Sequence, residues 1–150
     1  MLRAFPLLAL LGLGMAAPSV ALALDPVNNS LIGDVAIHGY DPVAYFLAGK
    51  PTEGSSSYSF TWQGAVWHFA SASNRDLFAR DPGRYAPQYG GYCAWAVSQN
   101  DTADIDPNAW KIVDGKLYLN YSLDIQHKWE ANQAANITAA NQNWPRLLAN

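Results

Sequence analysis

The chain has 150 residues, of which 50% are hydrophobic and 13% aromatic, with nine basic against twelve acidic residues and a net charge of −3. This composition excludes a disordered chain, and the scattered basic residues argue against a grip on nucleic-acid phosphates. The single cysteine, Cys93, excludes both an intrachain disulfide framework and a zinc site built from cysteines alone.

Residues 1–23 are typical of a secretory signal peptide. A basic start and an apolar run end in Ala21-Leu22-Ala23, which fits a small-residue cleavage site. We therefore expect a bacterial protein that is periplasmic or secreted, with a linker over 24–30 and one domain over 31–150. The alternative is an uncleaved membrane anchor, because the apolar run is just long enough to span a bilayer. Only in that case do we expect contact with a membrane.

The first part of the expected domain carries three local signals. Asp41 followed by Pro42 is typical of a helix N-terminus, and Gly49 is typical of the end of that helix. Gln63-Gly64 between two aromatic-rich segments predicts a hairpin turn, and Ser71 predicts a second helix N-terminus. We therefore expect a short helix, a β-hairpin and a second helix, at residues 41–49, 58–69 and 71–80.

The second part continues with the adjacent glycines Gly90-Gly91, which we expect where two backbone segments approach closely. Asp114-Gly115 predicts the turn of a second hairpin over 110–119. Ser122 begins a long helical region that we expect to fray or bend before Trp144-Pro145. No internal repeat is visible at any period. The expected fold is α+β, with small antiparallel β-hairpins, short helices and a longer C-terminal helix.

Several blocks of this sequence resemble the YHS domain family, and its exported, cysteine-poor branch most closely. The resemblance covers residues 31–145. It implies a YHS/TRASH-like fold and a role related to transition metals, copper in particular. The blocks that carry it are Gly39-Tyr40-Asp41-Pro42-Val43-Ala44-Tyr45-Phe46, Trp67-His68-Phe69-Ala70-Ser71, Tyr85-Ala86-Pro87-Gln88-Tyr89-Gly90-Gly91-Tyr92-Cys93 and Asp114-Gly115-Lys116-Leu117-Tyr118-Leu119-Asn120-Tyr121.

The cysteine metal site of that family does not carry over to this chain. Related domains beside copper-exporting pumps and multicomponent oxygenases hold metals with thiolates, and the matching positions here are Ala44, Ala70 and Asn74. Neither an alanine nor a neutral amide replaces a charged sulfur donor. The resemblance therefore implies the scaffold, which is a hairpin, the helix after Ser71 and an aromatic seam.

Cys93 is the leading candidate residue, either as a thiol that ligates a metal or reacts, or as a small buried packing residue. His68 and His38 are its candidate partners in a metal site, although sequence spacing does not bring the three together. For His127 we expect a solvated helix face. The tyrosines either form the core or line a pocket for an apolar ligand, the candidates being Tyr40, Tyr45, Tyr89 and Tyr92.

No hydrolase or phosphate-binding motif is present in the sequence. We therefore expect an exported, non-enzymatic binding module that handles a transition metal, with a copper ion bound by Cys93, His68 and His38. Tyr40, Tyr45 and Tyr92 are weaker candidates for ligand contacts. Two alternatives stay open: a structural or protein-interaction domain whose aromatic groove binds a partner, and a thiol redox protein that uses Cys93.

Overall fold

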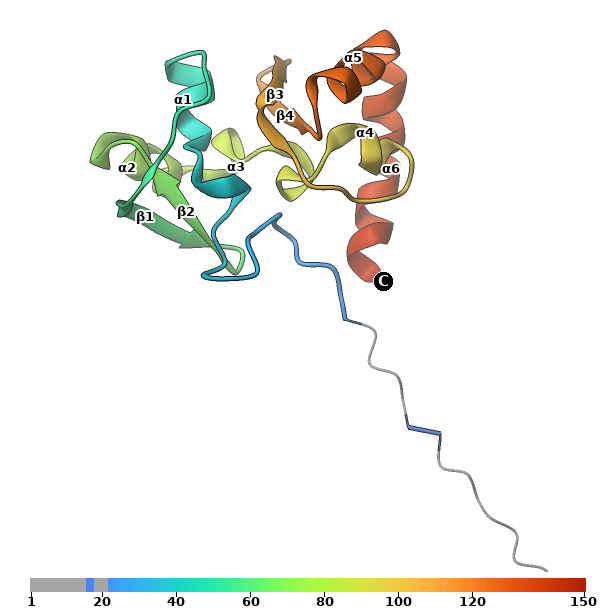
Figure 1. The fold of residues 1–150 in the computed structure, drawn as a ribbon, viewed down its shortest axis with the longest axis horizontal. Helices are drawn as coiled ribbons and strands as arrows, with labels where there is room; N and C mark the ends of the chain where they lie inside the picture. Colours follow the sequence, from blue (N-terminus) through green and yellow to red (C-terminus); the bar gives the residue numbers. More distant parts are fainter. Residues whose placement is uncertain (1–15, 18–21) are drawn as a thin grey trace, which may run out of the picture.

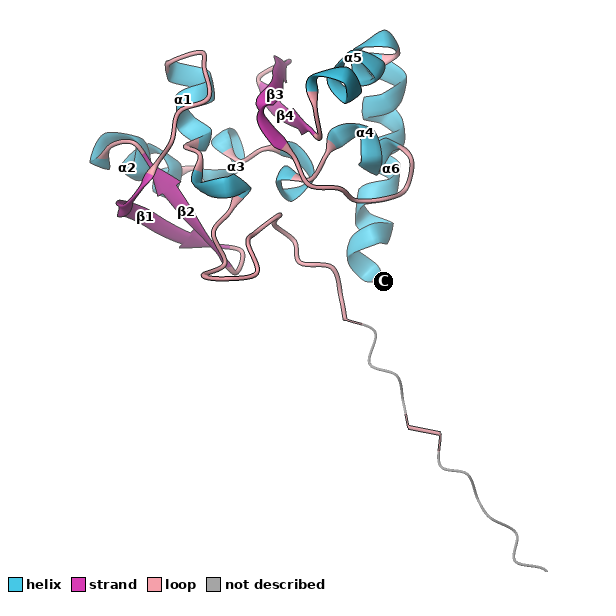
Figure 2. Cartoon of the chain, in the orientation of Figure 1, coloured by secondary structure: helices cyan, strands magenta, loops and turns pink. Residues whose placement is uncertain are grey.

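A computed structural model describes residues 16–17 and 22–150, so most of the predicted signal peptide over 1–23 lies outside the described residues. Within these residues, no helix combines the length and the apolar character needed to cross a membrane. The fold is α+β, as predicted. Two separate two-stranded antiparallel sheets are surrounded by short helices and a longer C-terminal helix (Figures 1 and 2).

The first set of elements follows the sequence signals closely. The Asp41 carboxylate accepts from the backbone N–H groups at the start of the first helix, and the Ser71 hydroxyl accepts from the N–H of Asn74 at 3.1 Å. The first strand begins earlier than predicted, because Ser55 pairs with Phe69 across a β-bulge. The elements are η1 (Ile37–Gly39), α1 (Pro42–Leu47), β1 (Ser55–Trp62), β2 (Ala65–Phe69) and α2 (Ala72–Arg80).

The second set has the same order of elements. Asp114 and Gly115 form the predicted hairpin turn, with φ of 50° and 74°, and the Ser122 hydroxyl accepts from the N–H of Ile125 at 3.2 Å. The close approach predicted at Gly90 is confirmed, since a Cβ there would overlap the backbone carbonyl of Pro26. The elements are η2 (Gln88–Gly91), α4 (Ala94–Ser98), β3 (Asp106–Val113), β4 (Lys116–Asn120) and α5 (Leu123–Ala131).

The two sets form an internal structural repeat that the sequence analysis missed. Each hairpin has strands of eight and five residues, and each is followed by a serine-capped helix of nine residues. The strand registers and bulges coincide at a shift of 51 residues, for example Ser55 to Asp106. We call residues 37–80 the first repeat and 88–131 the second repeat, and they lie side by side in Figure 1.

Each repeat has the same aromatic pair in its core. In the first repeat, the Trp67 and Phe78 rings are 5.1 Å apart at 34°. In the second, the corresponding Tyr118 and Trp129 rings are 5.2 Å apart at 37°. All four residues are buried, and burial of such rings is the main apolar contribution to stability. Each repeat therefore packs its helix against its own hairpin through an equivalent contact.

Two further helices complete the fold, α3 (Pro82–Tyr85) between the repeats and α6 (Gln133–Ala149) after them. The helical region after Ser122 breaks at Asn132, where φ is −136°, and α6 then continues through Pro145. The interruption expected before Trp144-Pro145 therefore occurs at Asn132, and Trp144 and Pro145 lie inside α6. The Asn143 amide donates to the carbonyls of Val97 and Ser98, which ties this part of α6 to the end of α4.

Candidate functional site

Cys93 is a buried residue directly before α4, with 1% exposure. Its sulfur lies 3.6 Å from Oδ1 of Asn120, which is itself fully buried. Burial raises the pKa of the Cys93 thiol, and the backbone N–H groups that act on the sulfur only partly offset this effect. A redox enzyme needs a lowered thiol pKa, so this environment argues against the redox-enzyme alternative.

His38 and Asp104 form a pair that the sequence analysis did not predict. Nε2 of His38 lies 2.7 Å from Oδ1 of Asp104, and Nδ2 of Asn28 donates to the same oxygen at 3.0 Å. Partial burial would raise the pKa of Asp104, but the hydrogen bonds from Asn28, His38 and the N–H of Ile105 outweigh it and hold that pKa below its usual value. The pair borders a pocket of about 230 Å³. Its partners are 66 residues apart, so no sequence spacing indicates it.

His68 lies in β2, where the predicted alternation holds. Trp67 and Phe69 are buried on one face of the strand, and His68 is only partly buried on the other. A Cβ added to Gly39 would lie 3.4 Å from Nδ1 of His68, so this ring packs against η1. His127 is exposed on α5, as predicted.

The three predicted metal ligands are not assembled into one centre. Cys93 contacts Asn120, whereas His38 contacts Asp104. Over residues 16–17 and 22–150, no group of three or more His, Cys, Asp or Glu side chains has an arrangement that could hold a metal ion. Copper binding by Cys93, His68 and His38 therefore stays a prediction, without a preformed site in the described residues.

The three predicted ligand-binding tyrosines lie in different surroundings. Tyr45 is a core residue with 1% exposure, its hydroxyl donates to a backbone carbonyl, and burial raises its pKa. Tyr40 is partly buried beside α1. Tyr92 packs on Trp144 at a centroid distance of 5.9 Å. None of the three lines the largest of the pockets described here, which Tyr89 lines instead.

The three positions at which the YHS resemblance would place thiolates surround one buried carboxylate. Asp41 is fully buried, and its Oδ1 accepts from the N–H groups of Val43 at 2.8 Å and Ala44 at 3.2 Å. Its Oδ2 accepts from the N–H of Ala70 at 2.9 Å and from Nδ2 of Asn74 at 2.7 Å. We call this network the Asp41 hub. Because each oxygen already accepts two hydrogen bonds, the Asp41 hub acts as a structural network.

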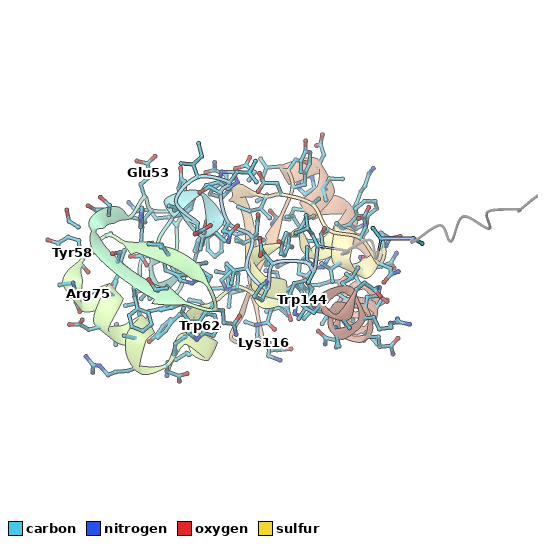
Figure 3. All side chains as sticks on the ribbon, turned by 90° about the horizontal axis from the view of Figure 1, so that it is seen from below. Glu53, Tyr58, Trp62, Arg75, Lys116 and Trp144 are labelled. Carbon is cyan, nitrogen blue, oxygen red and sulfur yellow. The ribbon has the colours of Figure 1, made fainter. Side chains whose placement is uncertain are left out.

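An aromatic groove of about 460 Å³ lies where the first repeat, the second repeat and α6 meet. Figure 3 shows Trp62, Lys116 and Trp144 near one another on the face seen from below. The rings have fixed positions: Trp62 packs against Trp67 and Phe78, and Trp144 packs against two tyrosines. The residues that define the groove are Trp62, Pro87, Tyr89, Lys116, Asn141 and Trp144.

Most polar groups that line this groove are hydrogen-bond donors. The Lys116 ammonium is a donor only, and it forms no ion pair with any described residue. The Tyr89 hydroxyl donates to Oδ1 of Asn141 at 2.9 Å, which leaves the amide N–H groups of Asn141 to donate elsewhere. The indole N–H groups of Trp62 and Trp144 bond to no other residue in the part of the chain that the structure describes. Among residues 16–17 and 22–150, no acidic side chain lines the groove.

Comparison with known proteins identifies no relative of this chain. No protein-family model, no curated protein and no solved structure matches it. Membership of the YHS domain family is therefore a proposal that rests on the sequence blocks, and the function has to be argued from the geometry.

Proposed function

We propose that the chain is an exported, non-catalytic binding module that holds a proline-rich segment of a partner protein. The observation that carries the proposal is the aromatic groove, whose volume of about 460 Å³ falls in the size range of ligand sites. The groove is open to solvent, so a ligand longer than the groove can enter it. This choice follows the protein-interaction alternative of the sequence analysis.

The donors of the groove match the chemistry of proline. A proline residue has a backbone carbonyl but no N–H, so a proline-rich segment accepts hydrogen bonds and donates none through its backbone. In the polyproline II conformation these carbonyls form no internal hydrogen bonds and point outward. Trp62, Trp144 and Asn141 line the groove, and each carries a side-chain N–H that can donate to such a carbonyl. The aromatic rings supply flat apolar surfaces for the pyrrolidine rings.

The positive charge of the groove indicates which residues the partner segment carries beside its prolines. Of the described residues that line the groove, Lys116 alone is cationic and none is a carboxylate that could balance its charge. A cationic segment would therefore be repelled, while a segment with an acidic residue beside its prolines would be attracted. We therefore expect the partner segment to contain prolines and at least one acidic residue beside them.

Binding can be measured through the indole N–H signals of the 15N-labelled full chain. The probe is a synthetic hexaproline peptide with one aspartate at its N-terminus. We expect saturable shifts of the Trp62 and Trp144 signals, while the signal of the buried Trp129 stays in place. Trp144→Ala should weaken binding by about tenfold or more, since aromatic anchors dominate such contacts. Lys116→Glu should weaken it by about fivefold, and should weaken binding of uncharged hexaproline less.

Matched controls separate the groove from general surface effects. Tyr58→Ala removes an exposed aromatic ring at the far end of the first repeat (Figure 3), and Lys50→Glu makes the same charge change outside the groove. Both should bind as the unaltered chain does. A glycine–serine peptide of equal length and charge should not bind. The proposed ligand is wrong if a cello-oligosaccharide shifts the two indole signals and hexaproline does not, and the groove itself is wrong if neither does.

Transition-metal binding through Cys93, His68 and His38 stays a separate prediction. Titration of the full chain with Cu(I), Cu(II) and Zn(II) tests it. If Cys93→Ala binds these ions as well as the unaltered chain, the assignment of Cys93 as a ligand is wrong.

A further inference from the structure

The second repeat has a counterpart of the Asp41 hub, and its central residue is Cys93. Both residues follow three consecutive positions with positive φ and then one tyrosine, and both stand directly before a short helix. The φ values are 40°, 57° and 78° before Tyr40, and 57°, 61° and 83° before Tyr92. Asp41 in the first repeat and Cys93 in the second therefore occupy equivalent positions of the backbone.

The same backbone donors surround the two side chains. The Asp41 carboxylate accepts from the N–H groups two and three residues later and from the first residue after the hairpin. N–H groups at the same three positions lie near the Cys93 sulfur and lower its pKa, but none forms a hydrogen bond to it among the described residues, and that of Trp95 donates to Oδ1 of Asn120 at 3.0 Å. The corresponding donors are Val43 and Trp95, Ala44 and Ala96, and Ala70 and Tyr121.

The two hubs differ in their fourth partner. Asn74 closes the Asp41 hub with an N–H donated at 2.7 Å. The corresponding residue of the second repeat is Ile125, which has no donor on its side chain. Ile125 and Cys93 instead line a mainly apolar pocket of about 270 Å³ together with Tyr121. The first hub is therefore filled, and the second has open space beside the sulfur.

A second observation indicates that the Cys93 hub lacks an acceptor. Asn120 is fully buried and its side chain is aimed at the sulfur, with Oδ1 3.6 Å from Sγ. The same Oδ1 accepts from the N–H of Trp95 at 3.0 Å, while Nδ2 has no partner among the described residues. A buried amide without an acceptor costs stability, and a neutral thiol is only a weak acceptor. The buried Nδ2 of Asn120 is therefore a donor for which the thiol, itself a donor to Oδ1, supplies no acceptor.

We propose that Cys93 is a site of oxidation by peroxide, and that its product is a sulfinate held as the Asp41 carboxylate is held. A cysteine sulfinate carries one negative charge and two oxygens on the atom bonded to Cβ, which is the arrangement of an aspartate. Its oxygens would accept from the backbone N–H groups and satisfy the Asn120 amide after rotation of that amide. The pocket beside Cys93 gives the oxidant room to enter.

The chemistry consumes two molecules of hydrogen peroxide. In the first step the sulfur attacks a peroxide oxygen, an S–O bond forms, the O–O bond breaks, and the products are sulfenic acid and water. The chain contains no second cysteine that could convert the sulfenic acid to an intrachain disulfide. A second peroxide therefore gives sulfinic acid and water, and loss of a proton leaves the sulfinate. Because burial raises the thiol pKa, we expect the first step to be slow and to accelerate at alkaline pH.

The first test is peroxide treatment of the folded full chain, followed by proteolysis and mass spectrometry. We expect the peptide that contains Cys93 to gain about 32 Da. We also expect the oxidised chain to unfold at a temperature several degrees higher than the reduced chain. Cys93→Ala reports oxidation of the two methionines and the six tryptophans without the thiol and should show no such rise. The proposal is wrong if Cys93 stays reduced in the folded chain under conditions that oxidise it in urea, or if oxidation lowers the unfolding temperature.

The second test replaces the sulfinate by its carboxylate analogue. Cys93→Asp should unfold at a higher temperature than Cys93→Leu, which fills space but accepts no hydrogen bond. Adding Ile125→Asn to Cys93→Asp rebuilds all four partners of the Asp41 hub and should raise the unfolding temperature further. A Cys93→Asp chain that is less stable than Cys93→Leu, or a double variant less stable than Cys93→Asp, would contradict the equivalence of the two hubs.

Discussion

The first and second repeats share a backbone and differ in what they place at its centre. In the first, Asp41 satisfies four donors with two oxygens. In the second, the Cys93 thiol donates to Oδ1 of Asn120, which also accepts from the N–H of Trp95, and the buried Nδ2 of Asn120 has no partner among the described residues. The difference shows that the same backbone forms with a strong acceptor or a thiol at this position, and that the thiol leaves a pocket of about 270 Å³ beside it.

The largest expected difference between the repeats comes from removing the two central side chains. Asp41→Ala leaves three backbone N–H groups and the Asn74 amide without acceptors, so we expect the free energy of unfolding to fall by about 4 kcal/mol. Cys93→Ala removes only a weak acceptor and should cost about 1 kcal/mol. Urea unfolding of both variants measures the two values. Equal losses of unfolding free energy in the two variants would mean that Asp41 and Cys93 contribute equally to stability, which would contradict the stronger hydrogen bonding at Asp41.

The next effect concerns the left-handed turn that precedes each hub. Gly90 is the second of the three positive-φ residues before Tyr92, and His38 is the second of the three before Tyr40, so the two positions correspond. In the first repeat a side chain fits there, but at Gly90 a Cβ would overlap the Pro26 carbonyl. We expect Gly90→Ala to cost about 3 kcal/mol in urea unfolding. Gly115→Ala, with positive φ but open space around it, should cost only about 1 kcal/mol, and a similar loss for both would contradict the close contact.

Local sequence signals predicted most elements within each repeat, but they did not predict that the two repeats have the same structure. Asx-Gly and Gln-Gly turns, serine caps and aromatic alternation are short-range features, so both hairpins and the helices after Ser71 and Ser122 were predicted. The repeat was missed because, over the aligned hairpins and helices, only Gly64 with Gly115 and Ser71 with Ser122 keep the same residue. Packing requires an aromatic pair in each core, and Trp67 with Phe78 serves as well as Tyr118 with Trp129.

The candidate sites were predictable only in part, because they form through long-range contacts. Cys93 was singled out as the one thiol, but its equivalence to Asp41 depends on backbone geometry that no residue pattern displays. The aromatic groove draws Trp62 from β1, Lys116 from β4 and Trp144 from α6. Its residues are far apart in sequence, so their convergence follows from how the repeats and α6 pack.

A smaller effect tests whether the two hairpin–helix junctions are energetically alike. Ser71 and Ser122 accept from the N–H three residues later at 3.1 Å and 3.2 Å. Ser71→Ala and Ser122→Ala should each lower the free energy of unfolding by about 1 kcal/mol, and the double variant by about 2 kcal/mol, because the sites are separate. Thermal and urea unfolding of the three variants gives the comparison. Losses that differ by more than about 1 kcal/mol between the two serines would indicate unequal packing of α2 and α5.

The smallest expected effect concerns the pair that joins the repeats, His38 in η1 and Asp104 before β3. Both side chains are about half exposed, at 47% and 54%, so the contribution is screened and should stay below about 1 kcal/mol. The pKa of Asp104 is lowered in the folded chain by Asn28, His38 and Ile105, which outweigh burial. A lowered folded pKa gives stability that is complete above the unfolded value, near 3.8, and that is lost as the pH falls through the folded pKa.

The difference in unfolding free energy between the unaltered chain and Asp104→Asn should therefore be constant from neutral pH down to about pH 4 and shrink below it. Urea unfolding at a series of pH values measures this difference. Asp101→Asn changes an exposed carboxylate of the same loop and controls for the loss of charge. A difference that grows as the pH falls below 4 would mean that Asp104 is held in its neutral form, and the contact between the repeats would then have to be explained by the Asn28 amide alone.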